Sequence, residues 1–349
     1  MSEPLVVLDA DVLGRQRTGD ETYVRSLLRE LAAATPSDLR LAAITRQPEL
    51  VPDGIEPVHL PARDQITRMA VGVPRLLRRL RPALAHFVHA LPLACPCPAV
   101  LTVQDLSFER DASVMGLRDR LVFRTTVPRS ARKAARVLAI SELTKRDLIE
   151  LYGIPEQKIV VTPLAADPAF TPDGPGADDD PYVLFVGALQ LRKEPTVAIE
   201  ALSLIDDAPR LVLVGPDKGG RAEAEETARR LGVATELRGH VTQEELAALY
   251  RGAACLVFPS RYEGFGLPVL EAMASGTPVV ATTAGALPEV AGDAAVLVEP
   301  GNAVALAGGI ERALADHDRL RAAGLARAAQ YSWAETARRT LEVYRELLA

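Results

Sequence analysis

The sequence predicts an α/β protein of two lobes, each a parallel sheet with helices on both faces. Short β-branched runs alternate with longer amphipathic segments along the whole chain, which is the pattern of parallel sheets. The length of 349 residues favours two domains. Near the middle, residues 168–181 combine prolines, glycines and three successive aspartates without apolar periodicity, so this segment is predicted to link the lobes.

The first lobe is predicted to span residues 1–167, with strands at Leu5–Leu8, Leu41–Thr45, Ala83–Val88, Ala99–Val103, Val137–Ile140 and Ile159–Thr162. The second is predicted to span residues 168–331, with strands at Tyr182–Val186, Leu211–Val214, Glu236–Arg238, Cys255–Phe258, Pro278–Ala281 and Ala295–Val298. Helical spacing is found at Thr22–Ala34, Leu143–Tyr152, Thr196–Leu204, Ala222–Leu231, Gln243–Arg251, Val304–His317 and Trp333–Leu348. The last of these helices forms a separate segment, residues 332–349, that need not belong to the second lobe.

The composition is that of a soluble globular protein, with 48% hydrophobic and 25% charged residues. The first ten residues contain two acids and no basic stretch, so they do not resemble a signal peptide. The longest uncharged run, residues 83–104, is interrupted by prolines and is expected to form two buried strands around a loop. Three cysteines cannot all pair, and CPC at residues 95–97 is too sparse for a zinc site. We therefore expect a cytoplasmic protein.

The net charge of −6 is unevenly distributed along the chain. Through Asp167 there are 23 lysines and arginines against 20 acids, and beyond it 17 against 26. The basic excess lies in residues 73–82 and 118–136, which are either ordinary solvated helix faces or a surface that meets an anionic membrane or acceptor. The acidic balance and an aromatic content of 4% argue against nucleic acid as a partner.

Several predicted strands of the second lobe end in a small residue, at FVG, LVG, LRG and FPS. One such glycine is usually explained by turn chemistry. Ligands of open parallel sheets bind beyond the carboxyl ends of the strands, where small residues let them approach the backbone. Small residues at several corresponding strand ends therefore favour a ligand site along this edge, beginning with Gly187.

The segment Arg261–Gly276, RYEGFGLPVLEAMASG, predicts a helix that begins near Pro268 and ends before Gly276. Unpaired N–H groups are expected at its start, on Gly264, Phe265, Gly266 and Leu267. Glu263 precedes these amides and Glu271 lies in the first turn. Acids near a helix start are ordinary, but two acids beside bare amides favour a ligand that carries hydroxyls and an anionic group.

The pair Arg192-Lys193 follows a strand and its glycine in the same lobe. Neighbouring basic residues usually lie on the surface, but here they stand at the predicted ligand-binding edge. Carboxylates accept hydrogen bonds from vicinal diols, and cations neutralise phosphates. Together these groups fit a nucleoside diphosphate sugar.

These motifs resemble glycosyltransferase family 4, a family of retaining enzymes with the GT-B fold. The resemblance is strongest in RYEGFGLPVLEAMASGTPVVAT and LPEVAGDAAVLVEP. LRGHVTQEELAALYRGAACLVFPS, FVGALQLRKEPTVAIEAL, VLTVQDLSF, RVLAISELTKRDLIELYGI and IVVTPLAAD match further family blocks in the right order. The resemblance implies two Rossmann-like lobes that face each other across a cleft, with a C-terminal helix that crosses back to the first lobe. It also implies transfer of a hexose in polysaccharide assembly.

The resemblance also implies roles for the second-lobe residues. Glu263 would hold donor-sugar hydroxyls and Glu271 the ribose, with the amides of residues 264–267 along the sugar and phosphate. Arg192 and Lys193 would neutralise the diphosphate leaving group. The residues predicted to act in the transfer itself are Glu263, Gln104, Lys193 and Arg192.

Further donor contacts are implied for the backbone around His240, which would meet the base, and for Gly187, Thr18 and Gly19. No divalent metal is implied, because the cations and the helix start would neutralise the phosphates. The acidic sequence at Asp9–Asp11 resembles a metal-binding DxD motif, but it ends the first strand, where this family often has a similar Asp-Ala pair. We therefore predict no metal site and no cofactor.

The chain departs from the family pattern at three places. The family's HDL motif reads QDL here, with Gln104 where a histidine lies by the transferred sugar, and a glutamine cannot act as an acid or base. In the loop after the first strand, Asp20 and Glu21 appear close to the expected diphosphate, a repulsive arrangement unless both side chains point away. Ala188 stands where arginine or threonine is frequent.

His86 and His89 lie at another strand end of the first lobe and, with Asp105, are candidates for acceptor or sugar contact. Taken alone, each histidine is more often structural. The interpretation is a retaining glycosyltransferase that uses GDP-mannose or a UDP-hexose and acts on a saccharide or lipid-linked acceptor. Its basic helices would give it peripheral contact with the inner face of the membrane. The departures keep a second hypothesis open, a non-catalytic member that binds nucleotide sugar or supports a partner transferase.

A nicotinamide dehydrogenase is a poor alternative, because no GxGxxG follows the first strand. The acceptor and the oligomeric state are not determined by the sequence.

Overall fold

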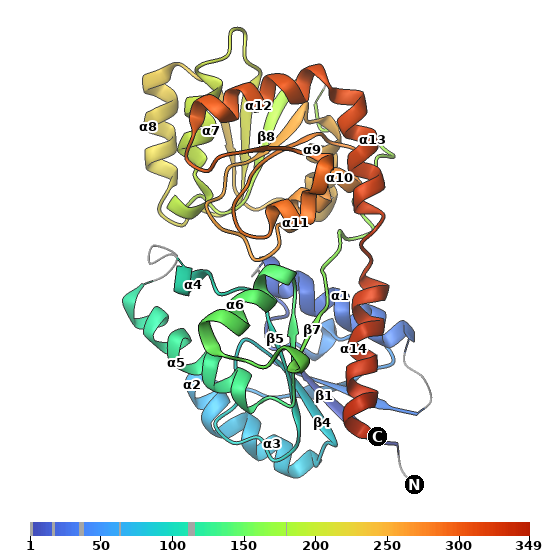
Figure 1. Ribbon diagram of the computed structural model, residues 1–349. Coiled ribbons are helices and arrows are strands. Elements are labelled where there is room, and N and C mark those ends of the chain that lie inside the picture. Colours follow the sequence, from blue (N-terminus) through green and yellow to red (C-terminus); the bar gives the residue numbers. More distant parts are fainter. Residues whose placement is uncertain (1–2, 16–17, 35–37, 63, 111–115, 179) are drawn as a thin grey trace. The chain divides into compact units, whose positions relative to one another are not determined.

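A computed structural model describes residues 3–15, 18–34, 38–62, 64–110, 116–178 and 180–349 (Figure 1). The described chain forms two compact units. The first holds the residues up to Leu164 together with Ser332–Ala349, and the second holds Ala165–Tyr331. Each unit contains one parallel sheet, which confirms the predicted α/β class.

The sheet of the first unit has seven strands in the order β3-β2-β1-β4-β5-β6-β7. The strands are β1 (Leu5–Asp9), β2 (Arg40–Thr45), β3 (Glu56–His59), β4 (Leu84–Val88), β5 (Ala99–Val103), β6 (Arg136–Ala139) and β7 (Ile159–Val161). All neighbouring strands pair in parallel. The strand β3 is absent from the sequence prediction because EPVH has a proline and only one buried position, at Val58.

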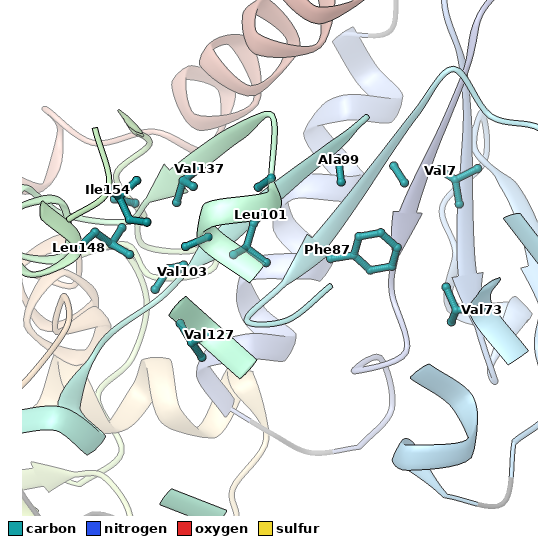
Figure 2. Packing of buried hydrophobic residues seen from close by; sticks show 14 of the residues in the cluster. Val7, Val73, Phe87, Ala99, Leu101, Val103, Val127, Val137, Leu148 and Ile154 are labelled. Atoms are coloured by element: carbon teal, nitrogen blue, oxygen red, sulfur yellow. The ribbon is translucent and has the colours of Figure 1, made fainter. Parts of the chain in front are cut away.

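The helices of this unit are α1 (Thr18–Ala34), η1 (Pro48–Leu50), α2 (Gln65–Thr67), η2 (Arg68–Gly72), α3 (Val73–Leu80), α4 (Ser107–Arg110), α5 (Leu117–Lys133), α6 (Glu142–Tyr152), η4 (Glu156–Lys158) and α14 (Trp333–Leu348). The helices α3, α5 and α6 bury apolar side chains in one cluster with the sheet. Figure 2 shows Leu101, Val127, Val137 and Leu148 of this cluster packed together. These helices therefore cover the same face of the sheet.

The helix α14 packs against α1. It is tied to the sheet through Tyr344, whose hydroxyl lies 2.6 Å from Nδ1 of His86. Arg339 of the same helix donates a hydrogen bond of 3.0 Å to the carbonyl of Val161 in β7. The last helix of the chain thus completes the core of the first unit, although it follows the second unit in sequence.

The sheet of the second unit has six parallel strands in the order β10-β9-β8-β11-β12-β13. They are β8 (Tyr182–Val186), β9 (Arg210–Val214), β10 (Thr235–Arg238), β11 (Cys255–Phe258), β12 (Val279–Thr282) and β13 (Val296–Val298). The helices are η5 (Leu191–Lys193), α7 (Pro195–Leu202), α8 (Arg221–Leu231), α9 (Gln243–Gly252), α10 (Leu267–Ala274), α11 (Leu287–Ala291), η6 (Gly292–Ala294), α12 (Ala303–Ala315) and α13 (His317–Ala328). The central strands β8 and β11 are buried along their whole length. The loops that follow them, 187–194 and 259–266, hold several of the candidate donor residues, among them Lys193 and Glu263.

None of the helices in the described ranges is long and apolar enough to cross a bilayer.

Candidate functional site

The helix α10 begins as the sequence predicts. Gly266 caps it with φ of 104°, Leu267 is its first residue and Pro268 follows. A Cβ on Gly266 would lie 2.6 Å from Cδ2 of Leu287, so both the backbone angle and the packing require glycine here. Among the described residues, no protein acceptor takes a hydrogen bond from the amides of residues 264–267. The start of α10 therefore presents a group of donors suited to an anion.

Glu263 lies directly before these amides and is buried. Its Oε1 is 2.5 Å from Nζ of Lys193 and 3.1 Å from a guanidinium nitrogen of Arg192. Burial opposes ionisation of the carboxyl, but the two cations outweigh it and hold the pKa of Glu263 below its ordinary value. Glu263, Lys193 and Arg192, which the sequence predicted to act in the transfer, thus form one charge cluster.

The backbone holds this cluster in place. The amide of Arg261 donates to the carbonyl of Arg192, at 2.9 Å, which joins the two loops. The amide of Ala286 donates to the carbonyl of Glu263, also at 2.9 Å, and a Cβ on Gly285 would lie 2.3 Å from that oxygen. The position of Glu263 is consequently fixed from both sides.

Lys193 lies over an aromatic ring, with Nζ 4.8 Å from the ring centroid of Phe258. Its aliphatic stem passes Gly187, where a Cβ would be 3.6 Å from Cδ of the lysine. The predicted glycine at the end of β8 thus lies beside the ammonium-bearing chain, and the ring face favours the cation.

Glu271 lies just after the first turn of α10, not within it as the sequence predicted, because the helix begins at Leu267. Its Oε2 accepts a hydrogen bond of 2.9 Å from the hydroxyl of Tyr250. Burial raises the pKa of Glu271 to about 7, with a further contribution from the carboxylate of Asp167, while the Tyr250 hydrogen bond acts in the opposite direction. Tyr250 is itself fully buried, and its carbonyl accepts a hydrogen bond from the hydroxyl of Thr277. The sequence did not single out Tyr250, because a tyrosine in an amphipathic helix reads as a core residue.

The other donor-site candidates of this unit differ in exposure. His240 is exposed and follows β10, at the edge of the sheet. The ring of Phe265 is buried edge-to-face against Tyr331, with centroids 5.9 Å apart, so this residue offers a ligand its amide rather than its side chain.

In the first unit, Gln104 follows β5 and is 8% exposed. Its backbone carbonyl accepts a hydrogen bond of 3.2 Å from the hydroxyl of Thr144. Its Nε2 has no hydrogen-bond partner among the described residues. The side chain extends toward the first turn of α1, where a Cβ on Gly19 would be 3.9 Å from Oε1. Thr18 is the first residue of that helix. A buried amide donor without a partner is costly and points to a ligand atom or water at this place.

The two unexpected acids of α1 are both engaged within the unit. Glu21 is buried and accepts a hydrogen bond of 2.9 Å from the amide of Gly14, and it also pairs with Arg25. Oδ1 of Asp20 lies 3.1 Å from Nε2 of His89. The carboxylate of Glu21 is thus turned back onto the loop after β1, which removes much of the repulsion expected from its sequence position.

The two candidate histidines occupy different environments. His86 is buried, with Nδ1 against Tyr344 and Nε2 2.7 Å from the hydroxyl of Thr102. Burial lowers the pKa of His86 to about 3, so the ring stays neutral and serves as an internal link. His89 is partly exposed and has a left-handed φ of 65°, a conformation that is uncommon outside glycine and often marks functional sites.

The remaining polar candidates of this unit are occupied by protein groups. Asp105 accepts hydrogen bonds from the amide and hydroxyl of Ser107 and so starts α4. At the DxD-like sequence, Asp9 pairs with the buried Arg68, and Asp11 accepts a two-pronged pair from Arg46 at 2.8 and 3.0 Å. Both aspartates thus form ion pairs with arginines of the same unit.

Two family models match the chain in succession. "Glycosyltransferase Family 4" matches residues 17–170, and "Glycosyl transferases group 1" matches residues 169–330. The chain belongs to glycosyltransferase family 4. Both matches meet at the segment that joins the two units, so the family pattern and the fold divide the chain at the same place.

Among curated proteins, the chain is 31% identical to O-antigen chain mannosyltransferase B of Escherichia coli, over 60% of this chain and 60% of the relative. It is 36% identical to D-inositol 3-phosphate glycosyltransferase of Nocardia farcinica, over 61% of this chain and 52% of the relative. The match thus spans between half and three fifths of the length of these relatives.

Solved structures share the fold at lower identity. Sucrose-phosphate synthase from Thermosynechococcus elongatus has a TM-score of 0.81 at 24% identity, covering 99% of both chains. Anabaena Alr3699/HepE in complex with UDP-glucose has a TM-score of 0.78 at 17% identity, covering 99% of this chain and all of the other. These similarities confirm the predicted two-lobed GT-B architecture.

Proposed function

We propose that this protein is a retaining glycosyltransferase that moves a hexose from a nucleoside diphosphate sugar to a saccharide or lipid-linked acceptor. The observation that carries the proposal is the arrangement at the start of α10, where Glu263, its two cations and a row of unpaired amides lie together. A sugar diphosphate needs hydroxyl acceptors, cations and anion-binding amides, and this arrangement supplies all three.

In the proposed complex, the diphosphate draws Lys193 and Arg192 away from Glu263. The carboxylate, released from its cations, then accepts hydrogen bonds from the sugar hydroxyls. Both cations stabilise the negative charge that grows on the leaving phosphate as the glycosidic bond breaks. The amides of residues 264–267 bind the phosphate and sugar, and Glu271, oriented by Tyr250, accepts the ribose hydroxyls. The reaction that we propose uses no metal and no further cofactor.

GDP-mannose is the first donor to test, because an E. coli relative is a mannosyltransferase by name. A UDP-hexose is the second, because a structural neighbour was solved with UDP-glucose. The proposed location is the cytoplasm, at the inner face of the membrane when the acceptor is lipid-linked.

The decisive experiment measures transfer and slow donor hydrolysis across a panel of GDP- and UDP-sugars, with and without a chelator. The anomeric configuration of the product is read by NMR, and retention is expected. Activity that survives the chelator supports metal independence. Full activity of both Glu263→Ala and Lys193→Ala would overturn the site.

The substitution Gln104→His tests the non-catalytic alternative. If the natural protein transfers sugar and histidine lowers the rate, the glutamine is an adapted part of the site. If the natural protein is inert and the histidine variant transfers sugar, binding without turnover is the better description.

A further inference from the structure

One face of the first unit combines exposed aliphatic side chains with an excess of arginine. The helices α3 and α5, with the adjoining Arg81, carry ten basic residues and a single acid, Asp119. The whole protein, in contrast, has a net charge of −6. We call this surface, together with α2, η2 and the loop at Leu93, the basic–aliphatic face.

The aliphatic part is concentrated at the start of α5. Leu117 is 85% exposed, Leu121 66% and Val122 55%. Spacing of four and five residues puts all three on the outward side of one helix, while Val127 and Ala131 of the same helix are buried against the sheet. A helix that only covers a sheet has no need of large apolar groups on its solvent side.

The same face continues across the loop between β4 and β5. The amide of Leu91 donates to the hydroxyl of Ser130 in α5, and the amide of Leu93 donates to the carbonyl of Met69 in η2. These two hydrogen bonds join α5 to η2 through the loop. Further exposed aliphatic residues lie along this path: Leu93 at 58%, Ile66 at 82% and Val71 at 37%.

Most of the cations on this face make no ion pair within the described residues. They are Arg75, Arg78, Arg79, Arg81, Arg118, Arg129 and Lys133, and all are exposed. By contrast, Arg124 is paired with Glu109, and the exposed Arg338 of α14 forms ion pairs with two acids of its own helix. Unpaired cations around exposed aliphatic groups complement a surface that is anionic outside and apolar beneath.

We propose that the basic–aliphatic face docks the protein on a bilayer that contains anionic lipid. In this arrangement Leu117, Leu121 and Val122 insert among the lipid head groups, and the arginines of α3 and α5 contact lipid phosphates. Burial of the aliphatic groups and attraction to anionic head groups both contribute to membrane binding. Either contribution alone would give only weak, reversible binding. This surface would bring the enzyme proposed above to a lipid-linked acceptor, but binding to vesicles does not depend on its activity.

The test is co-sedimentation of the full chain with vesicles of phosphatidylcholine alone or with about 30 mol % phosphatidylglycerol. Binding is expected only to the anionic vesicles, and salt should weaken it. The variant Leu117→Ser/Leu121→Ser/Val122→Ser is expected to lose about tenfold or more in partitioning. The variant Arg75→Gln/Arg78→Gln/Arg79→Gln should lose at least as much.

The matched control is Leu204→Ser/Val304→Ser, which removes comparably exposed aliphatic groups from the second unit and should bind as the natural protein does. Thermal melting checks that each variant is folded, and transfer to a water-soluble acceptor should be unchanged in all three. Absence of binding to anionic vesicles at low salt overturns the proposal. So does wild-type binding by the aliphatic variant, because the face would then be a general polyanion site.

Discussion

The start of α10 in the second unit and the end of β5 in the first unit each hold a buried polar side chain, and the two side chains differ in how they are paired. In the second unit, the buried carboxylate of Glu263 is matched by two cations that come from a loop some seventy residues away in sequence. In the first, the neutral side chain of Gln104 keeps a buried amide donor that has no partner among the described residues. A buried charge must be neutralised even in the free protein, whereas an unpaired neutral donor costs only a few kcal/mol.

This difference has a functional meaning. In the proposed complex the charged cluster exchanges partners, so its contribution to donor binding would include the separation of Lys193 from Glu263. The Nε2 of Gln104, without a partner among the described residues, would separate from no protein group and would gain a hydrogen bond directly in the proposed complex. Substitutions in the two regions should therefore affect activity and stability in different proportions.

The largest effect is expected for Lys193→Ala. Removal of the ammonium leaves Glu263 with Arg192 alone and takes one cation from the leaving phosphate. We expect kcat/KM to fall by about 10²–10³-fold, as for the loss of one group that stabilises transition-state charge. Steady-state kinetics measures this, with Lys145→Ala as the control, a partly exposed lysine of α6 that is likewise paired with a glutamate, Glu156. An effect no larger than that of the control would contradict the proposed role.

The next effect concerns the backbone at the start of α10. Gly266→Ala places a Cβ against Leu287 at a left-handed φ, so we expect a loss of about 1–3 kcal/mol in the free energy of unfolding, together with weaker donor binding. Gly308→Ala in α12 is the matched control, because a Cβ there meets no atom within 4 Å. It should stabilise the protein by up to about 1 kcal/mol. Denaturant unfolding compares them, and equal effects would mean that the geometry of the turn is not required.

A smaller effect is expected from pH. The pKa of Glu271 is raised to about 7, so the carboxylate that would accept the ribose is increasingly protonated below that pH. Donor affinity should therefore fall toward about tenfold per pH unit on the acid side and level off on the basic side. Calorimetric titration between about pH 6 and pH 8 measures this. In Glu271→Gln the dependence should disappear, and a slope that persists would assign it to another group.

The same shift predicts a stability effect of defined sign. The folded carboxyl keeps its proton to a higher pH than the unfolded one, so the folded state binds more protons between the ordinary pKa of glutamic acid and about 7. Ionisation of Glu271 thus lowers the free energy of unfolding as pH rises through this window. Glu271→Gln should remove this part of the decline, which thermal melting at several pH values can measure.

The smallest effect on stability is expected at Gln104. Because its Nε2 has no partner among the described residues, Gln104→Met should change the free energy of unfolding by less than about 1 kcal/mol, or even increase it. Sugar transfer should nevertheless decrease, since the amide would no longer reach the ligand. A large loss of stability with unchanged transfer would place the amide in the structural framework instead.

The local features of this site could be predicted from the sequence. In RYEGFGLPVLEAMASG, local residues define the turn and both ends of the helix. The glycines permit the turn, Pro268 suits the first turn of a helix, and Gly276, with φ of 77°, follows the end of the helix. The strands could be predicted likewise, because β-branched runs bounded by small residues have few other stable conformations. Such preferences act over a few residues and do not depend on the rest of the chain.

The partners of these residues were decided only by the tertiary structure. Glu263 meets Lys193 because β8 and β11 are neighbours in the sheet, and Glu271 meets Tyr250 because α9 packs against α10. His86 became an internal link only when α14, 258 residues away, brought Tyr344 to it. The order of strands and the docking of helices result from burying all apolar faces at once, so no short stretch of sequence contains this information.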